Sequence, residues 1–239
     1  VPQEVRDAGY ASTTGHIVHD YETLLSQSVG RLRGRTSEAR VATPEQAAHL
    51  AAFAAAMDAF ACFVARHARA AAALAETLTG EAAADWRQRA ESLDHIRAAP
   101  PETFAQAVQL LWLAHLFLHA ENPSVAISFG RIDQYLWPFL RRDLDAGRAT
   151  LADAFEVVSA FLVKCCEGEE SQNAVLGGVD AAGEDATNPV SYLFLAAMRR
   201  LSTFQPSLSV RLHPGSPPEF VDAACDLAAA GTGNPGFMN

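Results

Sequence analysis

The stretch from Ser128 to Leu140, SFGRIDQYLWPFL, gathers polar side chains that are well placed to do chemistry. Arg131, Asp133, Gln134 and Tyr135 follow one another closely between apolar runs. Buried polar groups cost free energy unless each finds a hydrogen-bond partner. This argument favours a buried hydrogen-bond network at a point where a strand turns into a helix. The alternative interpretation is the edge of a substrate cavity.

Histidines are the next candidates. His16 precedes a helical pattern, where it can bind a hydroxyl group, act as a general acid or base, or simply cap the helix. His115 and His119 lie four residues apart on one face of a predicted helix, with Glu121 nearby. A zinc site needs three or four ligands, and the rest of this helix is apolar, so we predict core packing and no metal. A metal-dependent hydrolase built on these three residues is the alternative.

Composition restricts the partners of the chain. Its 239 residues carry a net charge of -10 and are 49% hydrophobic. Without a basic stripe, neither a nucleic acid nor an anionic membrane is expected as a partner. No apolar run is expected to reach the ~18 residues of a membrane span, and no signal sequence is visible. The four cysteines lie inside helical patterns without a disulfide spacing, which is typical of the cytoplasm.

Hydrophobic periodicity and capping signals predict a mainly helical α/β chain. The predicted helices cover 17–32, 44–78, 81–97, 104–119, a segment ending at Gly147, 151–164, 189–201, and one from a capping box at 216–219 to Ala230. The predicted inner stripe of the longest helix is Leu50, Phe53, Met57, Phe60, Val64 and Leu74. The predicted strands are 125–129, 173–178 and 207–213, and the two ends of the chain are expected to be irregular. Three strands are too few to close a barrel.

Several short motifs occur in one order along the chain. They are Gly15-His16 with Asp20-Tyr21-Glu22; Gln109, Trp112 and His115; Ser128-Phe129-Gly130-Arg131 with Asp133-Gln134-Tyr135 and Pro138-Phe139; Gly177-Gly178, Gly183, Asp185-Ala186-Thr187-Asn188 and Ser191-Tyr192; Gln205 to Arg211 with His213; and Gly233-Asn234-Pro235. With these motifs the chain resembles the large domain of glycyl radical enzymes, in the group of pyruvate formate-lyase and the glycerol and choline dehydratases. The resemblance extends from about residue 15 to residue 239.

The resemblance implies a ten-stranded α/β barrel made of two half-barrels and wrapped by helices. It implies a lyase, dehydratase or formate-acetyltransferase-like activity on a small organic substrate, in an anaerobic cytoplasm. The resemblance also implies a glycyl radical, which a separate iron–sulfur activase installs with S-adenosylmethionine. This radical takes a hydrogen atom from a cysteine, and the resulting thiyl radical takes one from the substrate. No bound cofactor is implied for this chain, and the expected partners are the substrate, the activase and a second copy in a homodimer.

The chain departs from the family at the cysteine loop, whose glycine-cysteine-any residue-glutamate motif has no match after Gly233. We therefore expect one partial domain over residues 1–239, truncated at both ends and inactive by itself. Cys165-Cys166-Glu167 and the segment 6–11, RDAGYA, mimic the cysteine and glycyl-radical motifs, and we interpret both as chance matches. A non-catalytic helical scaffold that keeps only the shell of the fold is the alternative function.

The resemblance also implies which residues border the substrate: His16, Ala126, Ser128 and Asn173. Dehydratase-like members tend to carry a histidine–serine pair where this chain has Val125-Ala126. The loss of these polar groups suggests an apolar or differently anchored substrate. For Asn173 and its neighbour Gln172, ordinary hydrogen bonding at a strand end is the alternative to a substrate contact.

Overall fold

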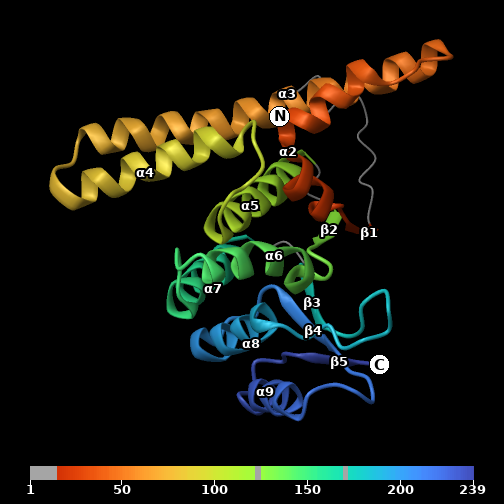
Figure 1. Cartoon of the computed structure of the whole chain (residues 1–239), viewed down its shortest axis with the longest axis vertical. Helices are drawn as coiled ribbons and strands as arrows, with labels where there is room; N and C mark the ends of the chain where they lie inside the picture. Colours follow the sequence, from red (N-terminus) through yellow and green to blue (C-terminus); the bar gives the residue numbers. More distant parts are fainter. Residues whose placement is uncertain (1–14, 122–124, 169–171) are drawn as a thin grey trace.

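The computed structural model describes residues 15–121, 125–168 and 172–239, and these ranges contain eight helices and five strands (Figure 1). The strands are β1 (Gly15–Val18), β2 (Val125–Ser128), β3 (Asn173–Gly177), β4 (Ser207–Arg211) and β5 (Gly236–Met238). The helices are α2 (Tyr21–Glu38), α3 (Pro44–Glu76), α4 (Gly80–Ile96), α5 (Phe104–Glu121), α6 (Ile132–Asp145), α7 (Leu151–Cys165), α8 (Pro189–Leu201) and α9 (Pro218–Ala229).

The five strands are parallel and lie in the order β1-β2-β3-β4-β5. The pairs β1–β2, β3–β4 and β4–β5 form regular ladders. Between β2 and β3 the ladder continues past the end of β2, where the amide of Phe129 donates to the carbonyl of Asn173 at 2.7 Å. Gly130 accepts from the amide of Val175 at 2.8 Å and bridges Ala174. Two short sheets therefore join into one arc of strands.

Helices α5 to α9 lie to one side of this arc (Figure 1). The strand side chains that face them are buried: Ile127, Ala174, Leu176, Leu208 and Val210 are at most 2% exposed. Helix α5 is central, since Ala107, Leu110 and Leu111 are fully buried in its middle turns. An apolar helix of this kind belongs inside a large protein, as the sequence predicted.

Local signals explain where several helices begin. The Thr43 hydroxyl accepts from the amide of Gln46 at the start of α3. Thr150 and Asp153 form a reciprocal capping box at the start of α7, and Asn188 caps α8 ahead of Pro189. Each cap satisfies amides that have no partner inside the helix. These starts agree with the sequence prediction, whereas α9 begins without a side-chain cap, so the predicted capping box at 216–219 is wrong.

Helix α3 lies across the top of the molecule as drawn in Figure 1, where it packs on α2 and α5, and α4 pairs with its second half. Phe60 and Val64 of the predicted inner stripe are buried, but Phe53 and Leu74 are 43% and 39% exposed, so that stripe is only partly correct. An 18-residue window of α3 has a mean hydropathy of 1.7, and 11% of it is buried. By length and composition α3 is long enough to span a membrane, contrary to the sequence expectation. A single helix of this kind is weak evidence, since helices of soluble proteins pass the same test.

Two strands were missing from the sequence prediction. Residues 15–18 form β1, and α2 begins only at Tyr21, although a helix was predicted from residue 17. Residues 236–238 form β5 in a segment predicted to be a loop. Both strands are short and lie at the two ends of the arc. A strand of three or four residues is defined by its neighbour more than by its own pattern, because sheet pairing depends on context.

Candidate functional site

The two faces of the arc of strands differ in character. On β4, Leu208 and Val210 point into the helical layer and are buried, while Ser207 and Arg211 are exposed on the opposite face. On β2, Ile127 is 2% exposed, so its neighbours Ala126 and Ser128 belong to the face opposite the described helices. Successive side chains of a strand alternate between faces. We call the face that carries Ala126 and Arg211 the open face.

Register places two of the predicted site residues side by side on the open face. His16 of β1 is directly opposite Ala126 of β2, and Val18 is opposite Ser128. Residues paired in a parallel ladder project to the same side of the sheet. His16 is exposed and Ser128 is 9% exposed. The imidazole of His16 therefore stands at the edge of the arc, next to the small side chain of Ala126.

Asn173 occupies the equivalent face of β3, because it precedes the buried Ala174. Its Nδ2 donates to the carbonyl oxygen of Ser207 at 2.9 Å and to Oγ of Ser209 at 3.1 Å. These bonds hold the amide across β3 and β4. Gln172 points elsewhere, since it is buried and donates to the carbonyl of Cys165. Both residues thus make the strand-end hydrogen bonds that were the alternative interpretation, and only Asn173 also belongs to the open face.

All four predicted site residues, His16, Ala126, Ser128 and Asn173, thus belong to one face of one sheet. The sequence prediction did not include Ser209 and Arg211, which alternate with the apolar Leu208 and Val210 on β4 and share this face, although Ser209 is only 4% exposed. The strict alternation of the segment 207–213 is the sequence signal that could have placed them on one face of a strand. A polar residue at every second position of a strand marks the face opposite the core.

The cluster after Ser128 is a hydrogen-bond network, as the sequence argument favoured. Oδ2 of Asp133 accepts from the amide of Gly177 at 2.7 Å and from Oγ of Ser191 at 2.6 Å. Arg131 donates to the carbonyl of Gly177, and Tyr135 donates to the carbonyl of Phe129. Gln134 completes the set with a bond to the carbonyl of Ala186. The network ties α6, β3 and α8 together behind the open face.

A second polar network lies inside the core, and it involves the two histidines of α5. The Tyr21 hydroxyl is 2.9 Å from Nδ1 of His115, whose Nε2 is 3.1 Å from Nε2 of His119. His115 also stacks on Phe129, with ring centroids 4.1 Å apart. Burial, followed by the charge of His119, lowers the pKa of His115 to about 3. Burial also raises the pKa of Tyr21, so the pair consists of a protonated tyrosine and a neutral imidazole.

The predicted core packing of His115 and His119 is therefore correct, since these side chains are 1% and 6% exposed. Within the described ranges no group of three or more histidine, cysteine or acidic residues is arranged to hold a metal ion. The side chain of Glu121 lies outside the described part of the chain. The hydrolase alternative thus has no support from the described side chains.

The position of the triplet Cys165-Cys166-Glu167 explains why it is a chance match to the cysteine motif. Cys165 is fully buried at the end of α7, on the helical side of the sheet, and burial raises the pKa of its thiol. A buried thiol with a raised pKa is a poor nucleophile. The glycyl-radical mimic at residues 6–11 lies outside the described residues.

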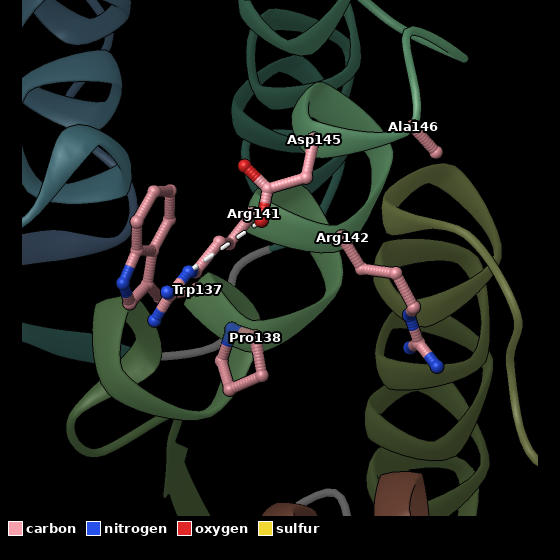
Figure 2. Close-up of a pocket in the computed structure, with 6 residues that line it drawn as sticks. All are labelled: Trp137, Pro138, Arg141, Arg142, Asp145 and Ala146. Atoms are coloured by element: carbon pink, nitrogen blue, oxygen red, sulfur yellow. Dashed lines mark ion pairs between the residues drawn. The ribbon is translucent and has the colours of Figure 1, made fainter.

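A hollow of about 570 Å³ lies on the outer surface of α6, and all six residues that line it belong to this helix or to its first following residue (Figure 2). Trp137 and Arg141 flank it, and Arg141 forms an ion pair with Asp145 at 3.7 Å. Arg142 points away from this pair, toward another helix (Figure 2). The hollow contains none of the open-face residues, so we do not consider it the substrate site.

Gly130 fixes the start of the turn between β2 and α6, and it provides a test of the packing there. Its φ is +64°, and a Cβ at this position would lie 2.8 Å from Cγ1 of Val18. Gly147 is the matched control, with φ of +63° and open space around it. We expect Gly130→Ala to lower the free energy of unfolding by about 1 to 2 kcal/mol more than Gly147→Ala does, because both suffer left-handed strain and only one adds a clash. Urea unfolding measures the difference, and equal losses would mean that Val18 does not contact Gly130.

Comparison with known proteins identifies the family. The family model of pyruvate formate lyase-like proteins matches residues 5–239. The chain is 32% identical over 260 residues to a protein of Escherichia coli K12 named probable dehydratase YbiW. The alignment covers 98% of this chain and 32% of that protein.

Two solved structures have the same fold. A glycyl radical enzyme from Archaeoglobus fulgidus superposes with a TM-score of 0.85 at 31% identity, covering 91% of this chain and 31% of that one. The glycerol-bound B12-independent glycerol dehydratase of Clostridium butyricum superposes with a TM-score of 0.87 at 26% identity, covering 95% of this chain and 32% of that one.

The expected fold class is thus confirmed, because the five parallel strands and their helices are part of the ten-stranded α/β barrel of glycyl radical enzymes. The chain spans about a third of the length of the relatives that it matches. The protein belongs to the pyruvate formate lyase-like family.

Proposed function

We propose that this chain forms one wall of the reaction chamber of a glycyl radical lyase or dehydratase that acts on a small organic substrate. The observation that carries the proposal is the convergence of His16, Ala126, Ser128 and Asn173 on the open face of a parallel sheet. A barrel closed from such an arc encloses this face. An enclosed, water-poor chamber suits radical chemistry because it prevents side reactions.

The cysteine that forms the thiyl radical is, in this proposal, supplied by residues other than these 239. Its thiyl takes a hydrogen atom from a substrate carbon, so that an S–H bond forms and the unpaired electron stays on the carbon. The residues of this chain bind and orient the substrate. Correct placement of the reacting carbon is itself a large part of catalysis.

Asn173 and His16 are the polar groups proposed to contact the substrate. The Nδ2 bonds to Ser207 and Ser209 fix the orientation of the Asn173 amide, and no side chain or amide in the described ranges donates to its Oδ1, which can accept from a substrate. The exposed imidazole of His16 can accept from or donate to a substrate hydroxyl. Ala126, beside His16, leaves an apolar surface. We infer a substrate with a hydroxyl or similar group next to an apolar portion.

The full enzyme is proposed to require a radical S-adenosylmethionine activase, to form a homodimer and to reside in the cytoplasm. The test uses the complete reading frame that contains residues 1–239, expressed without oxygen together with its activase. We expect a glycyl-radical doublet by electron paramagnetic resonance and conversion of a small hydroxylated substrate. Turnover by the isolated 239-residue chain, or absence of the radical from the complete protein, would contradict the proposal and favour a non-catalytic scaffold.

Asn173→Ala provides the residue-level prediction. We expect this change in the complete enzyme to lower kcat/KM about 10- to 100-fold, the effect of losing one or two hydrogen bonds to substrate, without changing the radical yield. Gln88→Ala on the exposed surface of α4 is the control and should leave kcat/KM unchanged. Steady-state kinetics together with spin counting makes the comparison, and an unchanged kcat/KM in Asn173→Ala would remove this residue from the site.

A further inference from the structure

Arg211 is the one formally charged side chain in the five strands that the structure describes. It ends β4, directly after the fully buried Val210, and therefore projects from the open face. Its register neighbours are Gly177 on β3 and Met238 on β5. A guanidinium thus stands at the carboxyl end of a parallel sheet, which is where α/β proteins commonly bind their ligands.

Arg211 has no acceptor in the described part of the chain. Other arginines with a fixed position do have one: Arg131 donates to the carbonyl of Gly177, and Arg148 forms an ion pair with Asp143 at 2.7 Å. No hydrogen bond or ion pair within the described ranges involves the guanidinium of Arg211, which is exposed. Its five N–H donors are therefore available to a ligand.

The backbone beside Arg211 makes room for its side chain. Gly178 has φ of +85°, and a Cβ there would lie 3.1 Å from Cβ, 3.4 Å from Cδ and 3.5 Å from Nε of Arg211. A side chain at position 178 would push the arginine aside. Gly177 has a different role, because a Cβ there would lie 2.7 Å from Cε1 of Phe220. Gly178 thus lets the arginine stem lie against the backbone, which directs the guanidinium and reduces its freedom.

We propose that Arg211 binds the oxyanion, a carboxylate or sulfonate, of a small-molecule substrate. This inference rests on the proposed function and extends it to a substrate class. The planar guanidinium matches both anions through paired N–H donors. In an enclosed chamber an unneutralised guanidinium is unfavourable, so an anionic substrate is favoured over a neutral one. The amide of Asn173, whose Nδ2 is held by Oγ of the buried Ser209, lies on the same face and can receive the uncharged polar part of such a molecule.

The test is a binding measurement on the 239-residue chain, which needs no radical. Backbone amide signals of Gly177 and Gly178 are followed by NMR during titration with methanesulfonate and with acetate, and 1,2-propanediol serves as the neutral probe. We expect saturable shifts with the two anions and none with the diol. Arg211→Gln should weaken anion binding at least tenfold, and Arg211→Lys, which keeps the charge but loses the planar donor pair, should give an intermediate affinity.

Arg200→Gln is the matched control, because Arg200 is an exposed arginine of α8 on the helical side of the molecule. It should bind the anions like the unchanged chain. Equal binding by Arg211→Gln, or no saturable shift at all, would overturn the inference. Binding is measured without turnover, so the two proposals can fail separately. Saturable anion binding together with an inactive complete protein would contradict the proposed function and still support the anion site.

Discussion

Asp133→Ala is expected to lower the free energy of unfolding of this chain by about 3 to 5 kcal/mol. The carboxylate is fully buried, and its Oδ2 accepts from the amide of Gly177 and from the Ser191 hydroxyl. Alanine would leave both donors buried without an acceptor, and each such loss costs about 1 to 3 kcal/mol. Three elements, α6, β3 and α8, lose a common anchor. Chemical denaturation followed by circular dichroism measures the effect.

Asp145→Ala is the control for this change, since Asp145 lies at the end of the same helix and its side chain is 73% exposed. Its effect on stability should be small, as is usual for surface positions. Ser191→Ala removes one of the two donors and should give a smaller loss than Asp133→Ala. A loss below about 1 kcal/mol in Asp133→Ala would show that the network is not an anchor of the fold.

Acidification is expected to destabilise the chain through His115. Its pKa falls from an ordinary value of 6.5 to about 3, chiefly because of burial and then because of His119. Below pH 6.5 the unfolded chain therefore binds a proton that the folded chain does not. Stability from this group is complete above pH 6.5 and declines by about 1.4 kcal/mol per pH unit down to pH 3, an order-of-magnitude total of 4 to 5 kcal/mol.

His115→Gln isolates this contribution, because glutamine can still accept from Tyr21 but does not titrate. We expect its unfolding free energy to depend less steeply on pH between 6.5 and 3 than that of the unchanged chain. The carboxylates titrate alike in both proteins, so the difference between the two slopes is the quantity of interest. His49→Gln, at an exposed position of α3, should keep the steep slope. Parallel pH profiles for His115→Gln and the unchanged chain would rule out a neutral buried imidazole.

The helical part of the fold could be predicted from the sequence because its signals are local. Thr43, Thr150 and Pro189 mark helix starts within one residue of those observed. The network around Asp133 was predictable for another reason, since several polar side chains inside an apolar segment need partners. Their partners Gly177 and Ser191, however, are 44 and 58 residues away, and no local rule identifies them.

The candidate site was only partly predictable, because a face of a sheet exists only once strands are paired. β1 and β5 are too short to have a clear pattern of their own. His16, Ala126, Ser128 and Asn173 were proposed from resemblance, and the register of β1 with β2 then placed the first two opposite each other. Arg211 was not proposed as a site residue. Its local sequence predicts a strand but does not show which face of that strand the helices cover.

The central claim is that the open face of this sheet lines an enclosed chamber in the complete protein. The most direct test is the rate at which a maleimide reagent labels a cysteine introduced by Ala126→Cys. The label is read at position 126 by peptide mass spectrometry, after replacement of Cys62, Cys166 and Cys225, while the buried Cys165 is kept. The account predicts fast labelling in the isolated 239-residue chain and labelling at least tenfold slower in the complete protein, slowed further by substrate. Equally fast labelling in both, unaffected by substrate, would show that the face stays open to solvent and would contradict the account.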